Sequence, residues 1–214
     1  MTKVTVIGGS GYAGSHIVEA AAVRGLEVTS MSRGEAAEQV AGVSYVTGSI
    51  LDAADRAKAL DGADVVVVAV SPRGVMAGQV RPAVAALAAQ AADAGVRLGV
   101  IGGAGSLQAV EDGPRLADTA EFGDEYRPEA LEMAGVLDDL LAAPEPLDWF
   151  LVSPAGDFGP WVAGEFTGRY RVGGDVLLTD AEGRSAIGGA DFGVAIVDEI
   201  ESPKHHRARF TVAY

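Results

Sequence analysis

Three glycines near the start of the chain are spaced as in a turn that binds phosphate groups. Gly8, Gly11 and Gly14 form a G-x-x-G-x-x-G pattern between a short apolar run and an Ala-rich stretch. Such a turn lets backbone N–H groups approach a pyrophosphate, and the helix that follows directs the positive end of its dipole at the same charge. The pattern predicts a dinucleotide site, with a purely structural turn as the alternative. The other residues expected to contribute are Ser10, Tyr12 and Ala13.

The end of the next apolar run bears on which dinucleotide would bind. Enzymes that use NAD place an Asp or Glu about twenty residues beyond the glycines, where it holds the ribose 2′-hydroxyl. This chain has Ser32 and Arg33 at that place. A guanidinium is a bidentate partner for a 2′-phosphate, and a serine hydroxyl can add a hydrogen bond. We therefore expect NADPH to be preferred over NADH; the alternative is that Arg33 is a solvated surface residue.

The segments that must position these residues are of two alternating kinds. Short β-branched runs, which predict strands, lie at 4–8, 27–33, 64–70, 97–103, 148–154 and 209–214. Ala-rich stretches, which predict helices, lie at 15–24, 53–60, 81–94 and 129–143. Three of these stretches are followed by a glycine where a helix C-cap is expected, namely Gly25, Gly62 and Gly95. Continuous apolar strands separated by helices predict an α/β fold with a Rossmann-like doubly wound parallel sheet.

A glycine-rich region at 158–190 interrupts this alternation. It contains Trp161, Phe166 and Tyr170, together with the segment YRVGGDVLLTDAEG, which predicts a hairpin at 170–183. We interpret the region as a small substrate-side cap on a single NAD(P)-binding domain that spans residues 1–214. The three aromatic side chains would then either line a pocket for an acceptor or pack the cap.

A second glycine phrase, VIGGAG at 100–105, nearly repeats the VIGGSG at 6–11. The repeat fits the two halves of a doubly wound sheet, in which the first and fourth predicted strands both end at the ligand crevice. The second copy lacks the third glycine of a pyrophosphate turn, because Ser106, Leu107 and Gln108 follow it. We therefore expect the two copies to have different roles.

Five segments together resemble one family of dinucleotide-binding proteins. They are GGSGYAG at 8–14, SR at 32–33, GGAGSL at 102–107, LDWFLVSPAG at 147–156 and RFTVAY at 209–214. These segments are similar to the NAD(P)-binding, NmrA-like group of atypical short-chain dehydrogenases/reductases, which includes NADH-flavin reductases and biliverdin-reductase-B-like enzymes. The resemblance covers nearly the whole chain, and its glycine motif is specific to the superfamily rather than to one substrate.

The resemblance implies places for further residues along the cofactor. The residues beside the adenine would be Ser49, Ile50 and Leu51, and those along the ribose and diphosphate would be Ala69, Val70 and Ser71. Pro154 would approach the nicotinamide. Gly103 and its small neighbours stand about where the superfamily carries its catalytic serine, and they would leave room for a flat ring on the nicotinamide.

Two residues are candidates for the catalytic step that the resemblance implies. Ser106 is the hydroxyl nearest to the expected serine, and its alternative role is a helix N-cap. The superfamily's proton relay is Tyr-x-x-x-Lys on one helix face. This chain has Tyr126 with Ala130 at the lysine position, so the relay is absent, and Pro128 predicts that a helix begins nearby. Tyr126 would line the pocket or simply pack.

The missing relay shapes the predicted function. Reduction of a ketone needs a hydride and a well-placed proton, whereas a flavin or quinone accepts hydride mainly by ring stacking and can take protons from water. We therefore predict an NADPH-dependent oxidoreductase with a flavin-like or quinone-like aromatic acceptor, with flavin as a possible substrate. The alternatives are a non-catalytic NADP(H)-binding redox sensor of the NmrA type and a nucleotide-sugar or steroid epimerase/dehydratase.

Composition limits the possible partners and compartment. The net charge of −14 disfavours nucleic acid and anionic membrane surfaces as partners. The chain has no cysteine, and its histidines, at 16, 205 and 206, lack the spacing of a metal site, so we expect no metal. No signal peptide or membrane-spanning run is recognisable, so a cytoplasmic protein, either a monomer or a homodimer, is expected.

Overall fold

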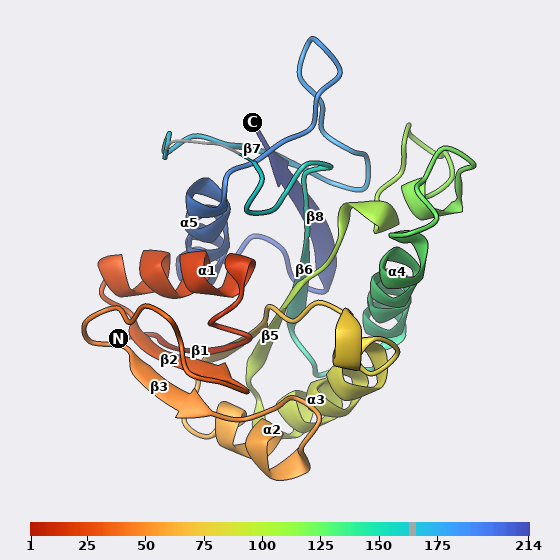
Figure 1. The fold of residues 1–214 in the computed structure, drawn as a ribbon. Coiled ribbons are helices and arrows are strands. Elements are labelled where there is room, and N and C mark those ends of the chain that lie inside the picture. The colour runs from red at the N-terminus through yellow and green to blue at the C-terminus, as the bar shows by residue number, and fades with distance from the viewer. Residues whose placement is uncertain (163–165) are drawn as a thin grey trace.

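The β-branched runs form the strands of one sheet, and the Ala-rich stretches form helices that cover it (Figure 1). The computed structural model describes residues 1–162 and 166–214. Within them the sheet has eight strands in the order β3-β2-β1-β4-β5-β6-β8-β7, and all neighbouring strands are parallel except β8 and β7, which are antiparallel. The predicted α/β, Rossmann-like fold class is confirmed. The strands are β1 Lys3–Ile7, β2 Glu27–Ser32, β3 Ser44–Thr47, β4 Val65–Val68, β5 Arg97–Ile101, β6 Trp149–Pro154, β7 Arg171–Gly173 and β8 Ala208–Ala213.

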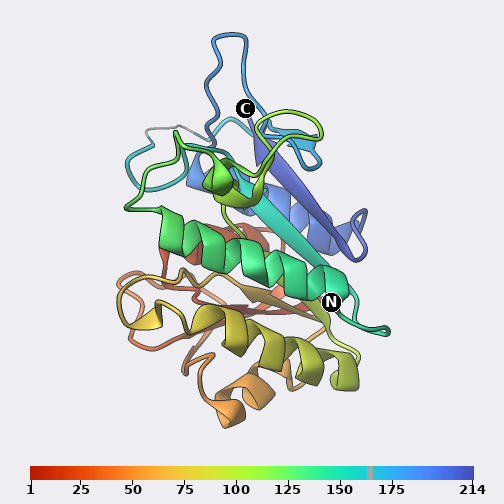
Figure 2. The same ribbon diagram turned by 90° about the vertical axis from the view of Figure 1, so that its right-hand side faces the viewer.

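The helices form a layer on each face of the sheet. The α-helices of the described residues are α1 Tyr12–Val23, α2 Ala53–Leu60, α3 Val80–Ala94, α4 Arg127–Ala142 and α5 Gly189–Glu201. Three single-turn 3₁₀ helices accompany them: η1 Gly74–Met76, η2 Ala104–Ser106 and η3 Leu116–Asp118. Helices α1 and α5 cover one face, and α2, α3 and α4 cover the other (Figure 2). The described residues include no helix with both the length and the apolar character that a bilayer crossing requires.

The core sits on both sides of the central strands because their side chains alternate between the two faces. In β4, Val66 and Val68 pack toward α2, α3 and α4, whereas Val65 and Val67 pack toward α1 and α5. All four side chains are buried, and burial of each stabilises the fold by about 1.5–3 kcal/mol. This rigid centre fixes the ends of the strands, where the glycine motifs lie.

Three glycines end helices as predicted. Gly25, Gly62 and Gly95 have φ of +77°, +66° and +67°, the left-handed region in which a residue with a Cβ is strained. Gly25 and Gly62 stand one residue beyond the C-caps of α1 and α2, and Gly95 is itself the C-cap of α3.

The second glycine phrase does not end at the switch point of the sheet, contrary to our expectation. The chain winds in opposite directions from β1, which pairs with β2 on one side and with β4 on the other, so the crevice opens between β1 and β4. The sequence pattern missed β3, a short and only half-buried strand. The phrase at 100–105 therefore follows the fifth strand, β5, which lies next to β4 but not next to β1.

The region at 158–190 pairs differently from the predicted hairpin. Arg171–Gly173 forms β7 and pairs with β8. The edge of β8 presents a regular row of backbone groups for this pairing, which the second arm of the predicted hairpin does not. A tight turn follows, in which the Asp180 N–H donates to the Arg184 carbonyl oxygen at 2.8 Å. The region ends where α5 begins, and the sequence analysis missed this helix.

A buried polar network ties α5 to the N-terminal end of β5. The Arg97 guanidinium donates to the Glu199 carboxylate at 2.7 Å and to the His205 carbonyl oxygen at 2.8 Å. The His205 N–H also donates to Glu199, at 3.0 Å. Burial alone raises the pKa of the Glu199 carboxyl, but these hydrogen bonds, that from Arg97 foremost, outweigh it and hold the pKa below its ordinary value. The network lies at the end of the strands opposite to the glycine motifs.

Candidate functional site

A cleft of about 330 Å³ lies at the carboxyl ends of β1, β2 and β4. Two of its lining residues are arginines and none is acidic, although the chain carries a net charge of −14. Ten predicted cofactor residues line it: Gly8, Ser10, Gly11, Ser32, Arg33, Ser49, Ile50, Ala69, Val70 and Ser71. The other lining residues, which the sequence analysis did not select, are Ile7, Met31, Gly48, Arg73 and Met76. The fold thus brings most of the predicted cofactor residues together.

The glycine turn closes so tightly that side chains are excluded at two positions. Gly8 has φ of +88°, and a Cβ there would lie 2.4 Å from the carbonyl oxygen of Ala69. A Cβ at Gly14 would lie 2.1 Å from the carbonyl oxygen of Gly8, because the first turn of α1 packs directly on the glycine loop. Gly11 is the N-cap of α1, with an extended backbone. Gly8 is therefore required for the close approach of the turn to the segment that follows β4, and Gly14 for the close approach of α1 to the turn.

The hydrogen bonds of the turn leave its helix end free to bind an anion. The N–H groups of Gly8 and Gly9 donate to the Met31 carbonyl oxygen, and that of Ser10 donates to the Ser32 hydroxyl oxygen at 3.0 Å. The N–H groups of Tyr12 and Ala13, in the first turn of α1, have no acceptor among the described residues. Unpaired N–H groups at a helix N-terminus are the donors that bind phosphate.

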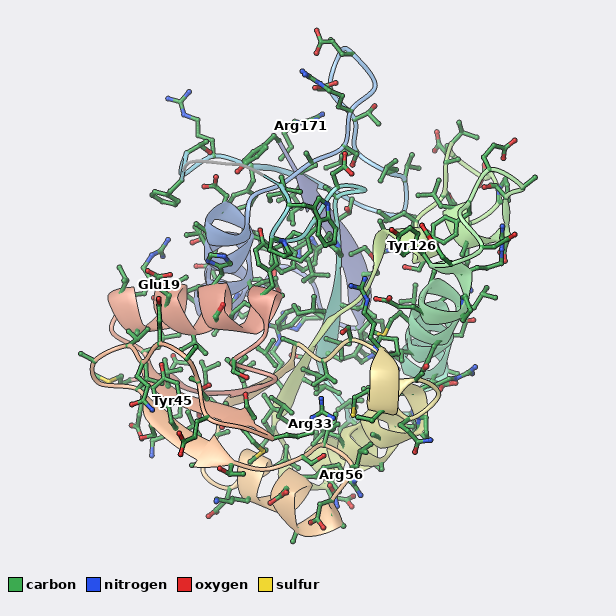
Figure 3. The ribbon with its side chains drawn as sticks, viewed as in Figure 1. Glu19, Arg33, Tyr45, Arg56, Tyr126 and Arg171 are labelled. Atoms are coloured by element: carbon green, nitrogen blue, oxygen red, sulfur yellow. The ribbon has the colours of Figure 1, made fainter. Side chains whose placement is uncertain are left out.

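Arg33 follows β2 directly and reaches the cleft with an exposed side chain. Figure 3 shows it between the strand ends and the segment that contains η1. Its guanidinium has no hydrogen-bond or ion-pair partner within 1–162 and 166–214. The neighbouring Ser32 hydroxyl already accepts the Ser10 N–H, which couples the glycine turn to the end of β2. A cation without an internal partner, beside a helix N-terminus, suits a phosphate ligand.

Arg73 is a second cation at the cleft that the sequence analysis did not select. It lies five residues beyond the end of β4, and its Nε donates to the Glu129 carboxylate of α4 at 2.5 Å. The Glu132 carboxylate, one turn further along α4, accepts the N–H of Gly78 at 2.6 Å and that of Val80 at 2.8 Å. Helix α4 thereby holds both ends of the segment that walls one side of the cleft. The signal in the sequence that could have identified Arg73 is a cation in the loop that follows β4, at the switch point of the sheet.

The predicted adenine segment is held by short-range hydrogen bonds. The Ser49 N–H donates to the Asp55 carboxylate at 2.8 Å, and the Ser49 hydroxyl accepts the Leu51 N–H at 3.3 Å. Ile50 is buried and lines the cleft, whereas Leu51 is partly exposed and lies outside it. An apolar surface with nearby backbone groups at this edge suits a planar base.

Five more of the predicted cofactor residues lie outside the cleft lining. Tyr12 turns its ring toward Phe158 and His16, with ring centroids 5.2 and 5.1 Å apart, and burial raises the pKa of its hydroxyl. The other four are Ala13 and Gly14 in the first turn of α1, Gly103 after β5 and Pro154 at the end of β6. The last two continue the same carboxyl edge of the sheet, because β5 pairs with β4 and with β6.

The two candidate catalytic residues differ in accessibility. Ser106 is 2% exposed, and its hydroxyl donates to the Gly103 carbonyl oxygen at 3.0 Å. It is the last residue of η2, so the alternative role as a helix N-cap is wrong; the N-cap of η2 is Gly103. Tyr126 is 55% exposed and is the N-cap residue of α4, which begins at Arg127 as Pro128 predicted. Figure 3 shows Tyr126 at the top of α4, well away from Arg33.

The aromatic residues of the region at 158–190 divide into two kinds. The Tyr170 hydroxyl donates to the Asp198 carboxylate at 2.5 Å, and burial raises its pKa, so this ring packs against the core. Trp161 and Phe166 are both exposed. No cluster of three or more metal-binding side chains occurs in the described part of the chain.

Comparison with known proteins agrees with this geometry. The sequence profile of the NAD(P)H-binding family matches residues 8–202. The uncharacterized protein YwnB of Bacillus subtilis is 38% identical over an alignment of 216 positions, which includes 98% of this chain and 97% of that protein.

Two solved structures are similar over almost their whole length. A proposed NADH-flavin reductase of Streptococcus pneumoniae has a TM-score of 0.88 at 34% identity, with 100% of this chain and 99% of that chain covered. A proposed epimerase of Bacteroides thetaiotaomicron has a TM-score of 0.89 at 32% identity, with 100% and 97% covered. These matches confirm the resemblance drawn from the sequence. The chain belongs to the NAD(P)H-binding family, within the group that resembles the atypical short-chain dehydrogenases/reductases.

Proposed function

We propose that the chain is an NADPH-dependent oxidoreductase that delivers hydride to a flavin-like or quinone-like acceptor. The observation that carries the proposal is the cleft itself, which joins a glycine turn and a helix N-terminus to two arginines without any acidic lining residue. In a chain with a net charge of −14, such a lining favours an anionic ligand over a neutral one.

The residues present fit a nicotinamide dinucleotide phosphate. The glycine turn and the first N–H groups of α1 would hold the pyrophosphate. Arg33 and Ser32 would hold the 2′-phosphate, since a guanidinium has the matching bidentate geometry and no carboxylate competes for a 2′-hydroxyl there. The apolar edge at Ile50 would hold the adenine, and Ala69 and its neighbours would follow the ribose.

The side chains near the second glycine phrase favour an acceptor that needs no proton from the protein. The bound cofactor would supply hydride. Tyr126 is followed by Ala130 where a relay lysine would stand, and the Ser106 hydroxyl hydrogen is directed at the Gly103 carbonyl oxygen. Flavins and quinones take hydride by ring stacking, with protons from water, so they suit a site of this kind.

A second candidate function is a non-catalytic NADP(H)-binding redox sensor. The absence of the Tyr–Lys relay and the bonded Ser106 hydroxyl also support it, because a cleft that binds a dinucleotide without that relay could report cofactor levels without turnover. The name of the Streptococcus pneumoniae protein supports the reductase, and that of the Bacteroides thetaiotaomicron protein supports an epimerase. Epimerase chemistry ordinarily uses the proton relay that this chain lacks.

Consumption of NADPH and NADH by the purified protein tests the proposal. FMN, riboflavin and a small quinone serve as acceptors, and binding of each dinucleotide is measured on the same samples. The proposal expects acceptor-dependent oxidation that is faster with NADPH than with NADH. Tight binding without turnover of any acceptor would contradict the reductase and favour the sensor.

A further inference from the structure

The Ser106 hydroxyl belongs to a chain of polar groups that joins the second glycine phrase to β6 and β8. Its oxygen lies 3.2 Å from the Ser153 hydroxyl oxygen and 3.3 Å from Nη1 of Arg209. Its hydrogen is directed at the Gly103 carbonyl oxygen, 3.0 Å away. Ser153 is wholly buried, and its hydroxyl has no other hydrogen-bond partner within residues 1–162 and 166–214, so its hydrogen points to Ser106. One donor and two acceptor positions of Ser106 are therefore all used.

Arg209 is the cation at the centre of this chain. Its side chain is 6% exposed, and Nη1 also donates to the Ser106 carbonyl oxygen at 3.0 Å. On its other side, Nε donates to the exposed Asp175 carboxylate at 2.7 Å. The Asp175 carbonyl oxygen in turn accepts the Gln108 N–H at 2.8 Å. Arg209 thus holds the peptide of Ser106 directly, and Asp175 holds the next turn of the same segment.

The segment held in this way has open space at one of its glycines. A Cβ at Gly102 would lie 2.7 Å from Leu151, and one at Gly105 would lie 2.6 Å from Ala130, so both glycines are packed against neighbours. A Cβ at Gly103 would have no neighbour within 4 Å. Gly103 lies at the carboxyl edge of the sheet, shortly after β5. Strand β5 pairs with β4, and the residues at the carboxyl end of β4 line the cleft.

We propose that Arg209 is a positioning residue, which fixes the backbone at Gly103 through Ser106 and so shapes the face on which the planar acceptor lies. The acceptor part of this inference rests on the proposed function. Ser106 is then a positioning residue as well, because its only hydrogen is committed to Gly103 and none remains for a substrate. A fixed carbonyl and an open glycine face present a flat surface, which suits a fused aromatic ring.

Hydrogen–deuterium exchange tests the positioning role without any turnover. The reporters are the N–H groups of Leu107 and Gln108, which bond to Ala104 and Asp175. Arg209→Met and Ser106→Ala should each speed exchange in 103–108 by about tenfold, because the segment loses its anchor. The exchange rate in Arg209→Lys should lie between the rates in wild type and in Arg209→Met, since lysine keeps the positive charge but lacks the forked guanidinium. Unchanged exchange in a folded Arg209→Met variant would overturn the proposal.

Steady-state kinetics tests the acceptor part. Arg209→Met and Ser106→Ala should each raise the acceptor KM by about tenfold and leave the Kd of NADPH within about twofold of wild type. The double variant should resemble either single one, because the two residues act in series. Arg184→Met, which removes an arginine from an exposed turn, is the matched control and should change neither.

Three outcomes separate the possible failures. An unchanged acceptor KM, or equal losses of NADPH binding and acceptor binding, would overturn the assignment of the acceptor face to Gly103. A large fall in kcat with unchanged KM in Ser106→Ala would instead make Ser106 a proton donor. A wild-type protein that reduces neither FMN nor a quinone would refute the proposed function and with it the acceptor face, and hydrogen exchange would then decide the role of Arg209 by itself.

Discussion

Replacing Arg33 with alanine should weaken the binding of NADPH far more than the binding of NADH. The Arg33 guanidinium reaches the cleft from the end of β2 and has no partner within the described residues, so its loss removes no internal contact. The free energy of unfolding should therefore stay within about 0.5 kcal/mol of the wild-type value, as for most surface substitutions. Any change in affinity then reports the ligand rather than the fold.

The expected size follows from the exposure of the side chain. A hydrogen bond to a charged group contributes about 1.5–3 kcal/mol when it is partly shielded from water. Because Arg33 is exposed, solvent and salt screen its interaction, and the lower end of that range applies. About 1.5 kcal/mol corresponds to a Kd for NADPH that is about tenfold higher. NADH lacks the 2′-phosphate, so its Kd should change by less than about twofold.

Fluorescence titration of both dinucleotides on both proteins measures this difference. Arg184→Ala, on an exposed turn, is the control for loss of one positive charge and should leave both affinities unchanged. The NADPH affinity of the wild type should also fall with added salt more steeply than that of Arg33→Ala. Equal losses for NADPH and NADH, or no loss, would refute the assignment of Arg33 to the 2′-phosphate.

Three further predictions concern the turn, the buried network and the exposed aromatic. In urea unfolding, Gly14→Ala should lower the free energy of unfolding by about 1–3 kcal/mol and remove most of the dinucleotide affinity, because its Cβ would meet the Gly8 carbonyl oxygen. The control Gly25→Ala, at a residue with positive φ, should lower the free energy of unfolding by about 1–2 kcal/mol and leave the dinucleotide affinity unchanged. The free energy of unfolding should fall as the pH drops below about 4.3, because the Glu199 carboxyl has a lowered pKa in the folded state and the carboxylate stabilises the fold only while it is ionised. Glu199→Gln should make the free energy of unfolding depend less on pH in this range. Iodide should quench Trp161, which is 64% exposed, but not Trp149, which is 1% exposed, so Trp161→Phe should abolish quenching.

The parts of the site that the sequence predicted are those whose geometry is local. Gly14 is required by a contact with Gly8, six residues earlier, and Gly8 by its own positive φ, so the glycine spacing is visible in the sequence even though the contact of Gly8 with Ala69 is not. Arg33 was predictable because a parallel strand fixes where its next residue must emerge. The C-cap glycines belong to the same class, since a left-handed residue needs no distant partner.

The parts that the sequence did not predict depend on distant residues. Arg73 reaches the cleft because two glutamates of α4 hold its loop, and no pattern within the loop encodes that tether. The surroundings of Ser106 include Arg209, which lies 103 positions later in the chain, so no local pattern reveals that this guanidinium donates to the carbonyl and hydroxyl oxygens of Ser106. Helix α5 was missed although Phe192, Ile196 and Ile200 recur at helical spacing, because the glycine-rich region before it dominated the interpretation.

The measurement that tests the central claim most directly is a single turnover of protein-bound NADPH with FMN in the absence of oxygen. The reaction is followed by the loss of NADPH absorbance, with normal cofactor and with cofactor deuterated at the transferable position. Direct hydride transfer in the cleft predicts complete oxidation of the bound cofactor and a slower rate with deuterium. Bound NADPH that stays reduced in the presence of FMN, or a rate that deuterium does not change, would contradict the account.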